Sequence, residues 1–453
     1  MNSDLHRGPW SPDSWQSFPV LQEIPWGTEN VAALAAAKDK LRRMPPLVTS
    51  WEIEALRLEL AEAQEGKRFV LQGGDCAETF DRCTSNDIAA KLKVLLQASL
   101  VFVHEGRRPV VRIGRFGGQY GKPRSAPTET IEGVELPSYF GDLVNAAPFE
   151  AGARRPDPSR LLDGYAHAAA TLNFVRSLGT RGFSDLAEPS QSDLSFLSHA
   201  ALSPELRAEY TRIAHGLRDA VRFVETLGER PLSDLFRTDI FASHEGLVLD
   251  WEAAQTRTVP RRDGYYNLST HLPWIGERAR KLGHAHVEFF RGIRNPVGVK
   301  IGPTTTPGEL LDLLDVLDPE NLPGKIVLIT RFGAGRAPEV LPPLIAAIQA
   351  TKRRVLWIAD PMHGNGEKLA SGQKTRRFDR IVTELDEVVA THRRCNSIFG
   401  GVHLELTGED VTECLGAGVE EEDLARNFES ACDPRLNYRQ ALEIAFRLAR
   451  LVK

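Results

Sequence analysis

Val355-Leu356-Trp357-Ile358-Ala359 is an apolar run that stops abruptly at the polar cluster Asp360-Pro361-Met362-His363-Gly364-Asn365. A buried parallel strand that ends this way presents polar side chains at its carboxyl end, where barrel enzymes carry their chemistry. The same construction recurs at Phe69–Glu78 and at Gly400–Leu406. The three segments supply an imidazole, a thiol and a carboxylate, so they indicate a metal site that is assembled in three dimensions.

Length and charge narrow the classes of protein. A chain of 453 residues with 42% hydrophobic residues can form one large domain with insertions, or two domains. Its net charge of −5 offers no basic field for nucleic acid or for an anionic membrane, so we expect neither as a partner. The N-terminus lacks an apolar core of signal-peptide length and no run of 18 apolar residues occurs, which predicts a cytoplasmic protein.

Apolar runs alternate with helical patterns from Arg68 onward, as is typical of a parallel βα architecture. Eight runs are predicted as strands: 69–72, 109–113, 239–243, 266–274, 297–301, 325–330, 355–359 and 402–406. Eight strands close a (β/α)8 TIM barrel, which is the predicted fold. The sequence Thr306-Pro307-Gly308-Glu309 predicts the start of one outer helix, and apolar residues at helical spacing from Phe378 to Val389 predict another.

The domain organisation follows from the same pattern. Residues 1–50 carry several Pro and Trp and are interpreted as an N-terminal extension laid against the core, with no catalytic role. Residues 51–453 are predicted to form the catalytic barrel. Between the second and third barrel strands lie a Pro-, Gly- and Ser-rich stretch at 121–155, interpreted as an active-site loop, and an accessory helical insertion at about 184–237 for contacts between subunits.

Charged residues stand at or just after the ends of most predicted strands. They are Arg115, Glu245, Glu277, Arg278, Lys300, Arg331, His363 and Glu405. In a barrel these ends meet on one face, and cations there are costly unless they are paired or bind a ligand, so the set predicts an anionic substrate. Lys122, Arg124 and Ser125 on a glycine-containing loop add a second anion site, and the two together favour a phosphorylated substrate. Solvated surface charge is the alternative for any one of these residues.

A metal site needs ligands from separate elements. The candidates are Cys76, His363, Glu405 and an acid such as Asp433. Mixed thiolate, imidazole and carboxylate ligation suits Mn²⁺, Fe²⁺, Co²⁺ or Zn²⁺ better than Mg²⁺ or Ca²⁺. The alternative is that Cys76 is a small buried hydrophobe, because no short ligand motif is present. The five cysteines form no CxxC pair, which argues against a disulfide framework.

Eight blocks in order carry a resemblance to a known family: LQGGDCAETF, GQYGKPRS, SHEGLVLDWE, WIGERAR, NPVGVKIGP, DPMHGN, GGVHLELTGEDVTECLG and ACDPRLN. Together they resemble the type II 3-deoxy-D-arabino-heptulosonate 7-phosphate (DAHP) synthases, from about Pro45 to the C-terminus. The resemblance implies a metal-dependent (β/α)8 transferase, a 3-deoxy-7-phosphoheptulonate synthase. Such an enzyme condenses phosphoenolpyruvate with D-erythrose 4-phosphate and water in the first step of the shikimate pathway.

The resemblance also implies roles for individual residues. The metal ligands are Cys76, His363, Glu405 and Asp433. The phosphoenolpyruvate site is Arg115, Glu277, Arg278, Lys300 and Arg331. The erythrose 4-phosphate site is Lys122, Arg124, Ser125 and Glu245. Lys300 and Glu277 are expected to manage protons, and Cys76 and His363 to act through the ion, which is expected to be Mn²⁺ or Co²⁺, with Fe²⁺, Zn²⁺ or Cd²⁺ as alternatives.

The sequence departs from the family pattern at three places. Ser138-Tyr139-Phe140-Gly141-Asp142 stands where many members read SYRGD, the segment 185–203 differs from the usual text, and the stretch 330–335 lacks a commoner acidic or amide residue. These departures leave two alternatives open. One is an amino-DAHP synthase that uses an amino or imino sugar phosphate in an aminoshikimate route of antibiotic biosynthesis. The other is a non-catalytic regulatory partner of a chorismate-pathway enzyme.

Three further expectations concern assembly and redox chemistry. The protein is expected to form a homodimer or higher homo-oligomer, and a chorismate mutase is a candidate partner. Cys432 precedes the proposed ligand Asp433. If Cys76 and Cys432 both reach the site, oxidation could join them and expel the metal.

Overall fold

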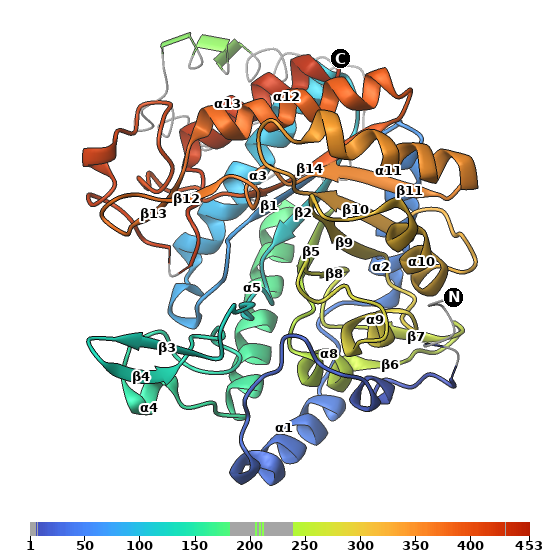
Figure 1. The fold of residues 1–453 in the computed structure, drawn as a ribbon, viewed down its shortest axis with the longest axis vertical. Coiled ribbons are helices and arrows are strands. Elements are labelled where there is room, and N and C mark those ends of the chain that lie inside the picture. The colour runs from blue at the N-terminus through green and yellow to red at the C-terminus, as the bar shows by residue number, and fades with distance from the viewer. Residues whose placement is uncertain are drawn as a thin grey trace.

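The computed structural model describes residues 6, 8–181, 204–205, 208–209, 211–212, 239–430 and 432–453. Parallel strands close into a barrel in the order β1-β14-β11-β10-β9-β8-β5-β2 (Figure 1). Their bounds are β1 Phe69–Gly74, β2 Val110–Arg115, β5 Ile240–Glu245, β8 Leu272–Ile275, β9 Val297–Ile301, β10 Ile326–Thr330, β11 Val355–Ala359 and β14 Phe399–Glu405. The predicted (β/α)8 fold is confirmed.

Only one end of the barrel, the one at the carboxyl ends of its strands, is accessible to a ligand. Its interior is filled by side chains such as Val111, Ile329 and Ile358, which form one buried cluster with residues of helix α2 (Ser50–Gln64). Gln64 of α2 accepts a hydrogen bond of 3.0 Å from the backbone N–H of Gly324, just ahead of β10. Helix α2 therefore closes the amino ends of the strands, and a ligand must bind at the carboxyl ends.

Helices surround the barrel, and two of them begin as the sequence predicts. They are α3 Ser85–Gly106, α5 Arg160–Arg181, α8 Leu249–Gln255, α9 Ala285–Phe290, α10 Pro307–Leu317, α11 Ala337–Thr351, α12 Phe378–Arg394 and α13 Tyr438–Leu451. In α10 the hydroxyl of Thr306 accepts from the N–H of Glu309 at 3.2 Å, and the Glu309 carboxylate accepts from the N–H of Thr306 at 3.0 Å. This reciprocal cap confirms the predicted start of α10.

The predicted fourth strand, 266–274, is wrong over its first half. Strand β7 (Tyr265–Asn267) pairs with β6 (Thr256–Thr258) in a separate sheet, and only β8 joins the barrel. The amide of Asn295 donates to the carbonyls of Asn267 (2.8 Å) and Thr270 (3.1 Å). Side-chain hydrogen bonds of this kind satisfy the backbone between the two strands in place of a ladder, which ends the strand.

Strand β14 begins at Phe399, three residues before the predicted start at 402. The prediction missed these residues because two of them are glycines. A Cβ atom on Gly401 would lie 2.4 Å from the carbonyl oxygen of Val70, so only glycine allows β14 to approach β1 this closely. Glycine weakens the strand signal in a sequence, and here it marks a close approach of two backbones.

The N-terminal segment contacts helices α8 and α9 of the barrel. It contains η2 (Ser14–Ser17), η3 (Thr28–Asn30) and α1 (Val31–Arg43). The indole N–H of Trp26 donates to Asp250 at 3.0 Å, and the buried His6 contacts the buried Glu288 at 2.9 Å. The predicted limits of the extension and of the catalytic domain remain predictions.

Smaller elements decorate the rim of the barrel. They are η4 (Phe80–Arg82), the hairpin β3 (Thr128–Ile131) and β4 (Val134–Pro137), α4 (Ala151–Arg154), the hairpin β12 (Gly366–Lys368) and β13 (Lys374–Arg376), and η6 (Glu421–Asp423). The predicted loop 121–155 thus holds a hairpin and a short helix, which project from the barrel in Figure 1. Most of the insertion predicted at 184–237, with its amphipathic helix, lies outside the described residues. Among the described residues, no helix has the length and hydropathy to cross a bilayer.

Candidate active site

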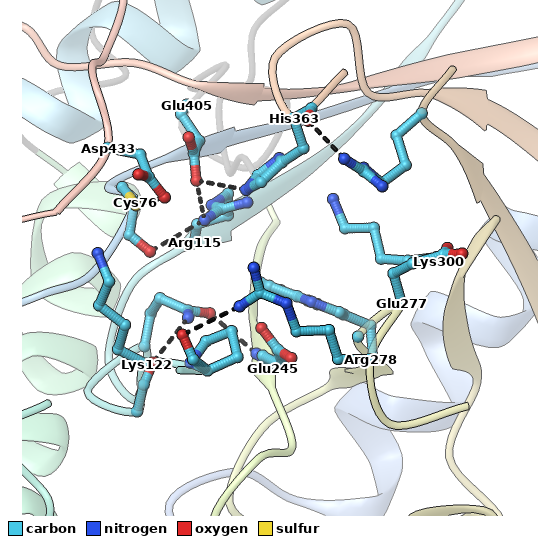
Figure 2. Close-up of a pocket in the computed structure, with 16 residues that line it drawn as sticks. Cys76, Arg115, Lys122, Glu245, Glu277, Arg278, Lys300, His363, Glu405 and Asp433 are labelled. Carbon is cyan, nitrogen blue, oxygen red and sulfur yellow. Dashed lines mark hydrogen bonds and ion pairs between the residues drawn. The ribbon is translucent and has the colours of Figure 1, made fainter. Parts of the chain in front are cut away.

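Every barrel strand contributes to one cavity of about 190 Å³ at the carboxyl ends. It is lined by Cys76, Arg115, Gln119, Gly121, Lys122, Pro123, Glu245, Trp274, Gly276, Glu277, Arg278, Lys300, Arg331, His363, Glu405 and Asp433. Figure 2 shows Cys76, Asp433, Glu405 and His363 gathered on one side, with Lys300, Glu277 and Arg278 on the other. The structure therefore brings together all but two of the predicted site residues.

His363 follows β11 and is oriented by a carboxylate of the same turn. Its Nδ1 lies 2.7 Å from Oδ2 of Asp360, and its Nε2 lies 3.1 Å from Oε1 of Glu405 at the end of β14. Burial alone would lower the pKa of His363, but the carboxylates of Asp360 and Glu405 outweigh it and raise that pKa. The ring is fixed at one nitrogen and offers the other to the cavity, as metal-binding histidines do.

Cys76 and Asp433 approach the same side of the cavity from other segments. The Cys76 sulfur lies 3.7 Å from Oδ2 of Asp433, and both residues line the cavity with Glu405. A hydrogen bond with Cys432, burial and the negative charge of Glu405 raise the pKa of the Cys76 thiol. The same hydrogen bond with Cys76 and the positive charge of the nearby Lys122 lower the pKa of the Cys432 thiol to about 7.

The donor set can be tested against a divalent cation. Within the described part of the chain, no three His, Cys, Asp or Glu side chains are gathered tightly enough to hold an ion in their present positions. The chemistry of the four predicted ligands nevertheless fits, because a thiol, an imidazole nitrogen and two carboxylates face one another in pairs. Glu405 is fully buried, and the neighbouring His363, Arg376 (2.7 Å) and Arg115 (3.0 Å) outweigh that burial and hold the pKa of its carboxyl well below the usual range, so it can accept an ion as a carboxylate.

The cations of the cavity are held by carbonyls and carboxylates of neighbouring strands. Arg115 donates to the carbonyls of Asp75 (2.9 Å) and Cys76 (3.1 Å), and its guanidinium lies 5.1 Å from the ring of Trp274. Arg331 donates to the carbonyl of His363 at 2.5 Å. Lys300 is buried and pairs with Asp360. Burial lowers the pKa of Lys300, against the opposing pull of Asp360.

Two cavity carboxylates lie away from the predicted metal ligands. Burial raises the pKa of Glu245, which ends β5 and whose backbone N–H donates to the side-chain oxygen of Gln119 at 2.9 Å. Glu277 follows β8 and accepts from Arg280 at 3.0 Å. The neighbouring Arg278 donates to the carbonyl of Pro123 at 3.4 Å, so the segment after β8 contacts the Lys122 loop.

Two residues predicted for the sugar phosphate do not line the cavity. Arg124 is half-buried and binds Glu129 at 2.8 Å, while Ser125 is exposed. Lys122, in the same loop, is buried in the cavity wall. The roles of Arg124 and Ser125 remain predictions, and they would require the loop to move inward.

Sequence reasoning missed three residues that support the site. Asp360 lies in the opening motif three residues before His363, and its position after a buried strand was the available signal. Gln119 lies in a block that also holds the cavity residues Gly121 and Lys122. Arg376 lies on β13, and no signal in the sequence relates that hairpin to β14. His403 on β14 is buried against Arg115, and its ring lies edge-on to that of Trp274.

A barrel cavity with five cations beside a cluster of potential metal ligands defines an enzyme for phosphorylated or carboxylated substrates. The family then follows from comparison with known proteins. A model of the class-II DAHP synthetase family matches residues 10–449, and this chain belongs to that family. The predicted family is confirmed.

Full-length relatives agree with this assignment. Proteins named phospho-2-dehydro-3-deoxyheptonate aldolase from Neurospora crassa and Streptomyces coelicolor are 45% and 42% identical, over 97% and 100% of this chain and 94% and 100% of theirs. A relative of that name from Mycolicibacterium smegmatis is 41% identical over 97% of this chain and 94% of its own. A solved DAHP synthase from Thermotoga maritima aligns at 14% identity with a TM-score of 0.32, over 84% of this chain and 70% of that one.

Proposed function

We propose that this protein is a DAHP synthase. It condenses phosphoenolpyruvate with D-erythrose 4-phosphate and water to give DAHP and phosphate, the first step of the shikimate pathway. The observation that carries the proposal is the convergence of the four predicted ligands and five cations in one cavity of a chain from the class-II DAHP synthase family. A non-catalytic regulatory role is disfavoured, because packing alone gives no reason to keep this set together.

Phosphoenolpyruvate would bind where the cations are densest. Arg115, Lys300 and Arg331 stand at three strand ends, and Arg278 adds a fourth charge from the segment after β8. Guanidinium groups suit the planar carboxylate and the phosphate, and a rigid barrel holds them in place before the substrate arrives. The buried Lys300 has a lowered pKa, which suits a group that must move a proton.

One divalent ion would be held by Cys76, His363, Glu405 and Asp433. When bound, it would supply Lewis-acid polarisation of the aldehyde oxygen of erythrose 4-phosphate. Mn²⁺ or Co²⁺ fits the mixed thiolate, nitrogen and oxygen donors. Asp360 keeps the His363 ring oriented toward that side of the cavity.

The residues of the chain then align the reacting atoms. C3 of phosphoenolpyruvate attacks the aldehyde carbon, water adds to C2, and the C–O bond to phosphate breaks. The cations hold phosphoenolpyruvate in near-attack geometry and stabilise the departing phosphate. Glu277 and Lys300 would take the proton from the attacking water and deliver protons to the developing alkoxide. Glu245 and Lys122 lie where they can bind the sugar phosphate.

The sugar phosphate is the point at which the amino-DAHP alternative differs. Phe140, which replaces the commoner arginine, is buried and contributes its backbone: its carbonyl accepts from the backbone N–H of Lys122 at 2.8 Å, and its N–H donates to the side-chain oxygen of Asn145 at 2.9 Å. Phe140 is not among the residues that line the cavity, so its side chain offers an amino group no direct contact there. We therefore favour erythrose 4-phosphate as the substrate.

One assay tests these proposals. Purified protein is stripped of metal, reloaded with Mn²⁺ or Co²⁺, and supplied with phosphoenolpyruvate and either erythrose 4-phosphate or its amino or imino analogue. Mass identification of DAHP from the natural sugar phosphate supports the proposal. Product from the analogue alone supports the aminoshikimate alternative, and no consumption of phosphoenolpyruvate with either contradicts both. The cytoplasmic location, the homo-oligomer and a chorismate mutase partner remain predictions, and light scattering with and without the mutase tests the last two.

A further inference from the structure

A hydrogen-bonded network outside the cavity joins two of its loops. The Arg331 loop, 331–335, follows β10, and the His363 loop, 360–365, follows β11. Asn365 is buried at the end of the second loop. Its amide nitrogen donates to the carbonyl of Pro361 at 2.8 Å, and its oxygen accepts from the N–H of Ala334 at 3.0 Å. One side chain therefore binds both loops.

Helix α12 anchors this junction with a carboxylate. Oε2 of Glu384, which is fully buried, accepts from the Asn365 amide at 2.7 Å, and Oε1 accepts from the N–H of Phe332 at 2.7 Å. One turn along the same face, Glu387 accepts from the N–H of Gly335 at 2.9 Å. Both loops are thus tied to one rigid helix behind them.

The loops leave no room to slide past each other. A Cβ atom on Gly364 would lie 2.3 Å from the backbone nitrogen of Gly333, so their backbones are in direct contact. On the cavity side, Arg331 donates to the carbonyl of His363 at 2.5 Å. A cation proposed for phosphoenolpyruvate and a ligand proposed for the metal are consequently placed relative to each other by this junction.

Stability alone does not explain Glu384. In the described part of the chain its oxygens accept from Phe332 and Asn365 and face no cation, and a buried carboxylate without a cation is costly. Burial raises its pKa to about 7, as expected for a carboxyl that no cation faces. A group kept at such a cost at the back of an active site suggests a role in function.

We propose that Glu384 and Asn365 are positioning residues for the reaction: they set the Arg331 guanidinium against the His363 imidazole and so couple the phosphoenolpyruvate half of the site to the metal half. The proposal rests on the function proposed above. It predicts that loosening the junction weakens the binding of phosphoenolpyruvate and of metal together, although neither residue touches either ligand.

A pair of reciprocal variants tests it. In Glu384→Gln, an amide N–H group replaces the oxygen that accepts from the Asn365 amide, so two donors face each other. In Asn365→Asp, a carboxylate oxygen faces the Glu384 carboxylate, so two acceptors face each other. Each single variant therefore leaves a buried mismatch. The double variant restores a donor facing an acceptor between positions 384 and 365, although the Pro361 carbonyl still lacks the donor that Asn365 supplied. We expect each single variant to raise the KM for phosphoenolpyruvate and the dissociation constant for Mn²⁺, titrated into metal-free protein, by about tenfold, the effect of one unpaired buried hydrogen bond. The double variant should recover part of both losses and bind phosphoenolpyruvate and Mn²⁺ more tightly than either single variant.

Matched variants separate positioning from folding. Asp386→Asn, two residues from Glu384 on α12, removes an ion pair with Arg447 on the outside and should leave both constants unchanged. Glu387→Ala loosens only the Arg331 loop and should raise the KM about threefold with unchanged metal affinity, a loss typical of one exposed hydrogen bond. This milder variant keeps the test decisive if the buried variants fold poorly.

The outcomes that overturn the proposal are distinct from failure of the proposed function. Wild-type protein that makes no DAHP contradicts the function. If the wild type is active, single variants that lose kcat or thermal stability while the KM and metal affinity stay at wild-type values show a structural role only. Glu387→Ala with an unchanged KM contradicts the proposal as well.

Discussion

Nδ1 of His363 lies 2.7 Å from Oδ2 of Asp360, and this contact turns Nε2 of the ring toward Oε1 of Glu405, 3.1 Å away. The imidazole is thereby held in one orientation between the two carboxylates, with Nε2 facing Glu405 at the cavity wall. Asp360 itself is buried and also pairs with Lys300, so one carboxylate serves the proposed metal side and the proposed phosphoenolpyruvate side.

The first prediction concerns this carboxylate. Asp360→Asn should lower the affinity of metal-free protein for Mn²⁺ or Co²⁺ about 10- to 100-fold, because the ring loses its orienting charge. Calorimetric titration measures the affinity. Asp379→Asn, an exposed carboxylate in the first turn of α12, serves as a control and should bind metal normally. Equal affinity in the two variants would contradict the orienting role.

The second prediction concerns Lys300. Replacing it with methionine keeps most of the buried stem but removes the charge that faces Asp360, and we expect kcat to fall about 10²- to 10⁴-fold, the range for loss of a proton-transfer group. Phosphate release measures turnover, and circular dichroism checks the fold. Lys281→Met, at an exposed position, should retain wild-type activity. A loss confined to KM would assign Lys300 to binding alone.

The third prediction concerns the thiol pair. A hydrogen bond with the Cys76 thiol and the positive charge of the nearby Lys122 lower the pKa of Cys432 to about 7. The pair can therefore supply a thiolate for oxidation. In metal-free protein, mild peroxide should join Cys76 to Cys432, which peptide mass spectrometry detects. After the same peroxide treatment, the Cys432→Ser variant should regain its activity when metal is added, because it cannot form this disulfide. Free thiols at both positions after treatment would refute this prediction.

The fourth prediction is a pH dependence of stability. Burial lowers the pKa of Lys325 to about 7, while its ammonium donates to the carbonyls of Ile293 and Asn295 at 2.6 Å each. Between about pH 7 and its ordinary pKa, the unfolded chain binds a proton that the folded protein does not. The free energy of unfolding should therefore rise with pH in this window, by up to about 1.4 kcal/mol per pH unit from this group.

Denaturant titrations of the wild type and of Lys325→Met at several pH values between 7 and 10 check this slope. Below pH 7 the lysine is protonated in both states and adds no slope. The variant should show a flatter dependence because its side chain does not titrate. Parallel curves for the two proteins would mean that Lys325 stays charged in the folded state.

Much of the fold could be predicted because each barrel strand carries its own signal. Strand β11 is a continuous apolar run that ends in a polar turn. The start of α10 is marked by the capping residue Thr306 and by Glu309 three residues later. The prediction failed at 266–274, where buried polar residues separate two short strands. It also failed at Gly400–Gly401, because glycine has a low preference for strands although both residues belong to β14. In both places a tertiary contact overrides local preference.

The candidate site was predictable to the extent that its residues follow strands. A residue after a strand, such as Arg331, is placed by the topology alone, because parallel strands end on one face. Arg376 could not be found this way, since it reaches Glu405 from a hairpin. Asn365 and Glu384 are 19 residues apart, and their contact depends on how α12 packs against two loops.

The sequence by itself determined the family, the barrel and the set of groups available at its carboxyl end, because these depend on residue type and order along the chain. Only the tertiary structure decided how those groups are paired: which nitrogen of His363 faces Asp360 and which faces Glu405, which cations hold Glu405, and that Arg124 lies outside the cavity. Pairing depends on distances of a few ångströms between segments far apart in the chain, and side-chain hydrogen bonds that span such segments leave no local pattern.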